Sequence, residues 1–180
     1  MDKSIDHDTF APPDKPVAAA APSAADGVNA EVQFHLGLKF AGSGGTMPDY
    51  VQAAEWYRKA AEQNHSGAQF NLGELYAHGQ GVRRDAVQSR AWYVKAAQQG
   101  DAGAQFNLGN SCHHASFSQV PAKAAESRIE AYKWFRLAAA QGYQGSEMAH
   151  VSLTLNMTRA DVTAGNQRVA AFEKAGDRGD

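Results

Sequence analysis

Three adjacent residues, Cys112, His113 and His114, carry side chains of the kind that bind transition metals. Structural zinc sites normally separate paired ligands by two to four residues, so that both can reach one ion. Adjacent side chains on a helix point in different directions. His78 lies 36 residues before His114, so these two imidazoles could approach each other on neighbouring helices. We expect no metal site and no cofactor, and we expect these histidines to be satisfied or exposed.

Side chains for nucleophilic or acid–base catalysis are present, but not in a recognisable catalytic arrangement. The chain contains neither Ser-x-x-Lys nor Gly-x-Ser-x-Gly, two motifs that place a serine nucleophile beside its activating groups. Glu55 and Glu62 lie seven residues apart with Arg58 and Lys59 between them, a pattern typical of a solvated helix face. The sequence therefore predicts no catalytic residue, and we expect that the protein is not an enzyme.

A stripe of polar residues has a spacing that suits hydrogen bonding to a partner. It comprises His35 in a first copy, Asn71, Glu74 and His78 in a second, and Asn107, Asn110 and His114 in a third. Positions i, i+3 and i+7 share one face of a helix. An asparagine amide both donates and accepts hydrogen bonds, as a peptide backbone does. We predict that this stripe lines a binding groove; the alternative is that Asn71 and Asn107 satisfy local backbone groups or face water.

The predicted groove has a definite length. Four helices packed about 8–10 Å apart give a groove of roughly 25–35 Å. That length matches about 8–10 residues of extended peptide.

The stripe recurs because the whole sequence repeats every 36 residues. The hexapeptide Ala-Gln-Phe-Asn-Leu-Gly is identical at 68–73 and 104–109, and a looser copy occupies 32–37. A period of 20–50 residues indicates stacked units that bury a core only against their neighbours.

All three tryptophans, Trp56, Trp92 and Trp134, begin a second recurring segment. We expect their indoles to lie in a buried seam between units, where truncation to alanine should cost about 3–5 kcal/mol.

Hydrophobic periodicity predicts eight helices and no strand. The helices are expected at about 30–41, 50–63, 67–78, 86–99, 103–113, 123–141, 145–156 and 159–175. Residues that adopt left-handed backbone readily follow several of these helices, namely Gly42, Asn64, Gly79, Gly100 and Gly142. Asp49 and Asp85, 36 residues apart, stand where N-caps are expected.

The third copy departs from the period. Leu72 and Leu108 are 36 residues apart, but Trp92 and Trp134 are 42 apart, so six residues are inserted around 111–127. Insertions in repeat arrays normally map to loops, and we expect a longer loop here.

The second copy resembles the Sel1-like repeat, a relative of the tetratricopeptide repeat. The matching residues are Ala68, Leu72, Gly73, Tyr76, Gly79, Gly81, Val82, Asp85, Trp92, Tyr93, Ala96, Ala97 and Gly100. The first copy matches through 49–50 and 56–61, and the third matches outside its insertion. The segment from Met157 to Phe172 resembles the closing helices of bacterial members. The resemblance covers about residues 30–175.

The resemblance implies an all-α protein, an α/α solenoid of three repeats with a C-terminal capping helix pair. The repeats would span about 30–65, 66–101 and 102–143, and the capping helices about 145–175. It also implies an adaptor or regulatory scaffold in signalling that binds a peptide or a partner helix on its concave face.

Two alternatives stay open beside the adaptor. Some Sel1-like proteins are described as β-lactamases or penicillin binders, but a serine acyl enzyme of that kind needs the Ser-x-x-Lys that this chain lacks. The other alternative is a structural module that self-assembles through the ends of the array. Disulfide-bearing members carry cysteine pairs in each repeat, and with one cysteine this chain falls outside that branch.

Bulk properties narrow the partner class. A net charge of −2 leaves no excess of basic residues to bind the phosphates of a nucleic acid. The sequence contains no run of 18 apolar residues, so we expect no transmembrane segment. Residues 1–28 hold four of the six prolines and the run Ala18–Ala21, and we expect a disordered tail before a repeat domain at 29–176. We expect a cytoplasmic monomer with a protein or peptide partner, or a periplasmic or secreted protein if a leader has been removed.

Overall fold

The structure is a computed structural model that describes residues 29–43, 45, 47–118 and 120–176; this part of the chain is helical and contains no strand. The helices are α1 (Ala30–Phe40), α2 (Tyr50–Glu62), α3 (Ser66–His78), α4 (Ala86–Gln98), α5 (Ala102–Ala115), α6 (Pro121–Ala140), α7 (Ser146–Thr154) and α8 (Arg159–Gly176). The predicted all-α fold is confirmed. The predicted tail at 1–28 lies outside the described residues.

Helix ends carry the local signals that the sequence predicts. The Asp49 and Asp85 carboxylates accept hydrogen bonds from the first-turn amides of α2 and α4. Three further N-caps recur with the 36-residue period at α1, α3 and α5, namely Asn29, His65 and Asp101. Gly42, Gly79, Gly100 and Gly142 all have positive φ, and Asn64 does so at 69°. These caps fix where each helix starts and stops.

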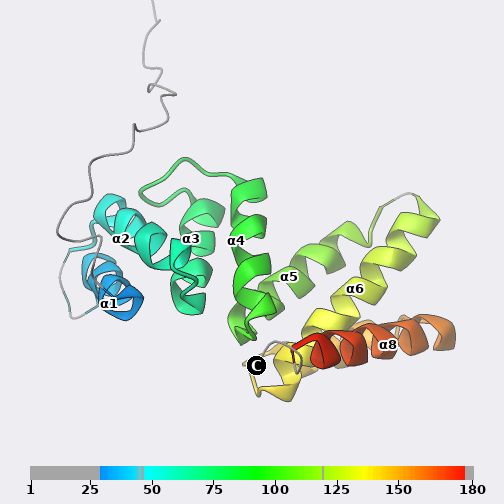
Figure 1. The fold of residues 1–180 in the computed structure, drawn as a ribbon. Coiled ribbons are helices and arrows are strands. Elements are labelled where there is room, and N and C mark those ends of the chain that lie inside the picture. Colours follow the sequence, from blue (N-terminus) through cyan, green and yellow to red (C-terminus); the bar gives the residue numbers. More distant parts are fainter. Residues whose placement is uncertain (1–28, 44, 46, 119, 177–180) are drawn as a thin grey trace, which may run out of the picture.

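Consecutive helices pack in antiparallel pairs, and the pairs stack in chain order (Figure 1). We call α1, α3 and α5 the A helices and α2, α4 and α6 the B helices. Each A helix packs on the B helix that follows it, and α2 and α4 also pack on the next A helix. At the first junction α1 also packs on α3. We call the side of the array on which these two A helices meet its inner side.

A glycine on each A helix sets the close approach within each pair. The glycines and the aromatic rings that cover them are Gly37 with Tyr57, Gly73 with Tyr93, and Gly109 with Phe135. A Cβ at Gly73 would lie 2.7 Å from the Tyr93 ring, closer than real Cβ atoms approach other atoms. The repeated glycine is thus required by helix packing.

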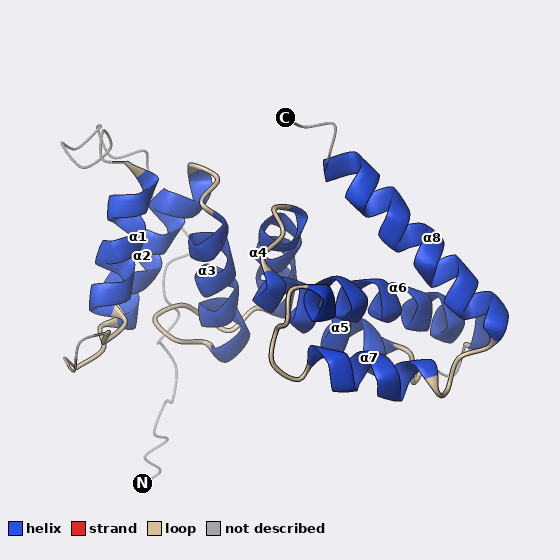
Figure 2. Cartoon of the chain, turned by 90° about the horizontal axis from the view of Figure 1, so that it is seen from below, coloured by secondary structure: helices blue, strands red, loops and turns tan. Residues whose placement is uncertain are grey.

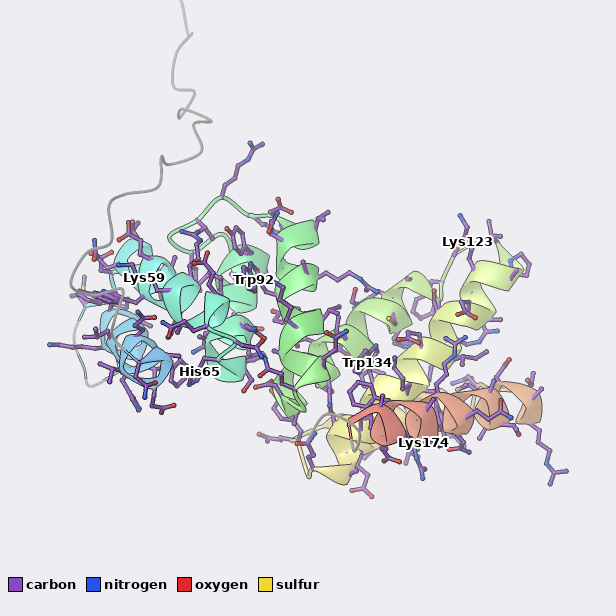
Figure 3. The ribbon with its side chains drawn as sticks, viewed as in Figure 1. Lys59, His65, Trp92, Lys123, Trp134 and Lys174 are labelled. Atoms are coloured by element: carbon purple, nitrogen blue, oxygen red, sulfur yellow. The ribbon has the colours of Figure 1, made fainter. Side chains whose placement is uncertain are left out.

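The seam is built from these rings and not from three indoles. Trp134 is buried at 6 % exposure, but Trp56 and Trp92 are only half-buried. Lys95 Nζ lies 3.9 Å from the centroid of the Trp92 ring. Trp92, labelled beside α4 in Figure 3, packs against the edge of the core that α2 and α3 form. The prediction of three equally buried tryptophans is therefore wrong for two of them, because the next residue on the helix takes the inward position.

A ladder of buried glutamines joins the repeats. Gln33, Gln69 and Gln105 are each 1 % exposed. Each Oε1 accepts a hydrogen bond from a glutamine at the end of its own B helix, from Gln63, Gln99 and Gln141 respectively. The amides of Gln69 and Gln105 also donate to the last-turn carbonyl oxygens of the preceding B helix, those of Ala61 and Ala97. The second and third rungs therefore hold both their own pair and the junction with the pair before it.

The six-residue insertion lengthens a helix. α6 begins at Pro121 and extends over 20 residues, against 13 in α2 and α4, so the expectation of a longer loop is wrong. The added turns carry Glu126 and lead into Glu130, and both carboxylates bind the Arg168 guanidinium of α8, at 2.7 and 3.0 Å. Their attraction holds α8 along α6.

The last two helices do not form another pair of the same kind. Both α7 and α8 pack on α6, but they are not packed on each other, and Figure 2 shows them diverging from the turn that joins them. Val151 of α7 occupies the register position of Gly73 and Gly109, so no aromatic ring could approach α7 there as closely. Gly165 of α8 instead receives the ring of Tyr132 from α6.

Candidate functional site

The predicted stripe is divided between side chains that bond within the protein and side chains that face solvent. Three of its members connect α3 to its neighbours. The Glu74 carboxylate accepts a hydrogen bond from the Tyr93 hydroxyl of α4 at 2.5 Å and from the Asn107 amide of α5 at 2.6 Å. Asn71 lies beside the Tyr57 hydroxyl one repeat earlier, as Asn107 lies beside the Tyr93 hydroxyl. Asn71, Glu74 and Asn107 are half-buried and therefore keep part of their surface open to a partner.

The surroundings of Tyr57 and Tyr93 keep both hydroxyl groups protonated, so each can donate a hydrogen bond. Burial, and next the Glu74 carboxylate, raise the pKa of Tyr93 far above its usual value of 10.0. Burial also raises the pKa of Tyr57, against a smaller opposing effect of its bond to Asn71. Both phenols therefore stay neutral and fix the side chains of the next A helix.

The remaining stripe residues are more accessible. His35 pairs with Glu31 at 3.1 Å and His78 pairs with Glu74 at 3.4 Å, each on its own helix and each more than 60 % exposed. Asn110 is partly exposed and His114 is exposed. These four side chains are the part of the stripe that a partner would meet first.

The Cys112–His114 segment does not converge on one point. Cys112 is buried at 4 % exposure, His113 is half-buried with an unpartnered Nδ1, and His114 is exposed. Within the described ranges, no group of three or more His, Cys, Asp and Glu side chains could hold a metal ion.

A cleft that the sequence reasoning missed lies directly beside Asn107. Its volume is about 200 Å³, and α3, α4 and α5 enclose it. Its polar lining comes from Arg84, Ser89, Arg90, Tyr93, Asn107 and Ser111. The missed signal is a departure from the repeat. Arg90 stands where the other repeats carry Ala54 and Tyr132, and Ser111 stands where they carry leucine.

The geometry of paired helices can now be compared with known families. A family model for the Sel1 repeat matches residues 30–65, 66–101 and 102–143. The chain belongs to the Sel1 repeat family. Each matched segment contains one A helix and the B helix that follows it, whereas α7 and α8 lie beyond the matched residues.

Two solved structures share the Sel1-type arrangement. One is c5321 of uropathogenic Escherichia coli, a protective antigen displaying an SLR fold, with 26 % identity and a TM-score of 0.68 over 81 % of this chain. The other is a Sel1 repeat protein from Oxalobacter formigenes, with 29 % identity and a TM-score of 0.60 over 84 % of this chain. The aligned region covers 30 % of the first protein and 60 % of the second.

No curated protein matches the chain. Among the described helices, none has the length and apolar character needed to span a membrane.

Proposed function

We propose that this Sel1 repeat protein is an adaptor or scaffold that binds an extended peptide or a partner helix on the inner face of its A helices. Sel1 repeats are commonly protein-interaction modules, which supports a protein partner. The observation that carries the proposal is the set of half-buried polar groups on α3 and α5, which lies beside an open cleft. A role in signalling and a location in the cytoplasm belong to the same proposal.

Fixed polar groups suit peptide recognition. Glu74 is held in position by Tyr93, Asn107 is held by Glu74, and Asn71 lies beside the Tyr57 hydroxyl, so little side-chain freedom is lost when a peptide binds. Half-exposed amides and a carboxylate can share their remaining hydrogen bonds with a peptide backbone. Affinity near 1 μM, about −8 kcal/mol, is expected for a short groove of this kind.

The test is selection from a random peptide display library on the immobilised full chain. Peptides that the wild type enriches should bind at least tenfold more weakly to Asn71→Ala/Asn107→Ala. The exposed outer-face variant Glu55→Ala/Glu62→Ala should bind them unchanged.

Because Asn71 and Asn107 also bond within the protein, a second variant protects the test from misfolding. Asn110→Ala/His114→Ala removes two stripe side chains that make no internal hydrogen bond, and it should also weaken binding. Failure to enrich any peptide would reject the proposal. Binding by both inner-face variants that is as tight as binding by the wild type would also reject it.

An assembly role is the second candidate, and one observation favours it. Met148 and Val151 of α7 and Leu155 at its C-cap form an apolar stripe with 73, 48 and 81 % exposure. Light scattering during size-exclusion chromatography distinguishes the two roles. The adaptor is expected to stay monomeric as its concentration rises. Concentration-dependent growth that Val151→Glu abolishes would favour assembly.

We further propose that the protein acts without catalysis, since its sequence contains no recognisable nucleophile–base pair. Nitrocefin turnover by the purified chain that a serine substitution abolishes would overturn this statement.

A further inference from the structure

We propose that the cleft between α3, α4 and α5 binds the carboxylate of a glutamate or aspartate side chain in the bound peptide. This inference rests on the proposed peptide-binding function and names the chemistry that the partner would carry.

Comparison of the three junctions at one set of register positions shows buried, mostly apolar side chains at the first and third and polar side chains at the second. At the first, Ala53, Ala54 and Leu75 are buried at 4 % exposure or less. At the third, the same register positions hold Ala131, Tyr132 and Leu153, again buried at 3 % or less. At the second junction these positions hold Ser89, Arg90 and Ser111. Arg90 and Ser111 are exposed, and the cleft of about 200 Å³ opens between them.

The two arginines of the cleft have no carboxylate partner among the described residues. Arg84 Nε donates to the Ala77 carbonyl oxygen at 3.1 Å, which leaves both of its terminal nitrogens available. Arg90 reaches the Ser111 hydroxyl at 3.5 Å and lies beside the Cys112 thiol, neither of which carries a negative charge. Arg168 by contrast binds two glutamates. The planar fork of a guanidinium matches a carboxylate in two parallel hydrogen bonds.

The acidic groups near the cleft do not line it. The Glu74 carboxylate is bound by Tyr93 and Asn107, and the Asp85 carboxylate caps α4. Burial raises the pKa of the Cys112 thiol despite the opposing effect of Arg90, so this thiol is neutral. The two guanidinium groups are therefore the charged side chains of the lining, and an acidic side chain in the cleft would complement them.

The size and lining of the cleft suit one acidic side chain. A volume of about 200 Å³ corresponds to roughly six or seven waters at about 30 Å³ each. Ala77, Ala86 and Leu108 provide an apolar surface for methylene groups. The Ser111 hydroxyl and the Asn107 amide add donors beside the arginines.

The test follows the side-chain Nε–Hε signals of Arg84 and Arg90 by NMR in the full chain. The probe is N-acetyl-glutamate amide, and its neutral isostere N-acetyl-glutamine amide is the control. The expected result is saturable shifts of both arginines with the glutamate probe and none with the glutamine probe. Arg83, which does not line this cleft, serves as an internal reference.

Two variants and two further probes decide the result. Ser111→Leu introduces the leucine found at the other two junctions, and it should abolish the shifts while the fold stays intact. Arg90→Gln should weaken binding of the glutamate probe at least tenfold. Acetylglycine and inorganic phosphate test a terminal carboxylate and a phosphate. Equal shifts with the glutamine probe, shifts that survive in Ser111→Leu, or tighter binding of either further probe would overturn the inference.

Failure of this inference can be distinguished from failure of the adaptor proposal. Display-selected peptides that lack acidic residues and bind Arg90→Gln as well as wild type would reject the carboxylate site while leaving peptide binding intact. Shifts with the glutamate probe, in a protein that enriches no peptide, would reject the adaptor but not the anion-binding cleft.

Discussion

Glycine at one position per repeat determines how closely the paired helices approach. Gly37, Gly73 and Gly109 each lie beneath an aromatic ring of the next helix. A larger side chain at such a position must displace the ring or separate the helices, and overpacking of this kind typically costs about 1–3 kcal/mol.

Gly73→Ala should therefore lower the free energy of unfolding by about 1–3 kcal/mol, measured by urea denaturation. Gly176→Ala is the matched control, because a Cβ there meets no atom within 4 Å, and it should change stability by less than about 0.5 kcal/mol. Equal effects of the two substitutions would contradict the packing role of Gly73.

His150 occupies the register position that Leu72 and Leu108 hold in earlier repeats. Its Nε2 is buried without a hydrogen-bond partner. Burial, and next the positive charge of Arg136, lower the pKa of His150 below its usual value of 6.5. Its contribution to stability is therefore fully present above pH 6.5 and is lost as pH falls through the lowered pKa.

His150→Leu should raise the free energy of unfolding by about 1 kcal/mol, since it removes an unpaired buried polar group. It should also reduce the loss of stability between about pH 8 and about pH 5, followed by urea denaturation at both pH values. A gain of the same size at the two pH values would show that His150 does not titrate as described.

The tryptophans of the B helices differ in burial, which sets the cost of losing each. Trp134→Ala should lower stability by about 3–5 kcal/mol, because Trp134 is buried and its ring packs edge-on against Phe172. Trp92→Ala should cost clearly less, since Trp92 is half-buried. Thermal unfolding of both variants measures this difference, and a larger loss in Trp92→Ala would be inconsistent with the packing.

The glutamine ladder links one helix pair to the next. Gln69→Leu removes the bonds from Gln69 to the Ala61 carbonyl oxygen and to Gln99, and leaves buried polar groups unpaired. We expect a loss of about 1–3 kcal/mol in urea denaturation. Gln98→Leu, on the exposed face of α4, should have little effect. A neutral Gln69→Leu would mean that the ladder adds no stability.

Local chemistry made the helices predictable, and relations between helices were harder to predict. The caps at Asp49 and Asp85 act within one turn, so each boundary can be inferred from a few residues. Trp92 and Tyr93 have the same period, and which of them turns inward depends on how α4 packs on α3. The inserted segment is also compatible with a helix, because Pro121 lies in the first turn of α6, where proline is favourable.

The candidate site was predicted only in part. The stripe through Asn71 and Asn107 follows from periodicity, but the groups beside these amides, the Tyr57 hydroxyl and the Glu74 carboxylate, come from other helices. Arg90 and Ser111 break the repeat, so a search for recurring residues passes over them. Aligning the repeats to find such departures would have located the cleft.

Across the whole molecule, the array presents a polar inner face on the A helices and an apolar stripe on α7. The adaptor proposal assigns the peptide to the inner face, and the two surfaces can be distinguished in one experiment. A display-selected peptide carrying a nitroxide spin label would be added to the ¹⁵N-labelled full chain, and amide broadening would be followed by NMR. We predict broadening of the Asn71 and Asn107 amides with those of Met148 and Leu155 unaffected; broadening confined to α7 would contradict peptide binding on the inner face.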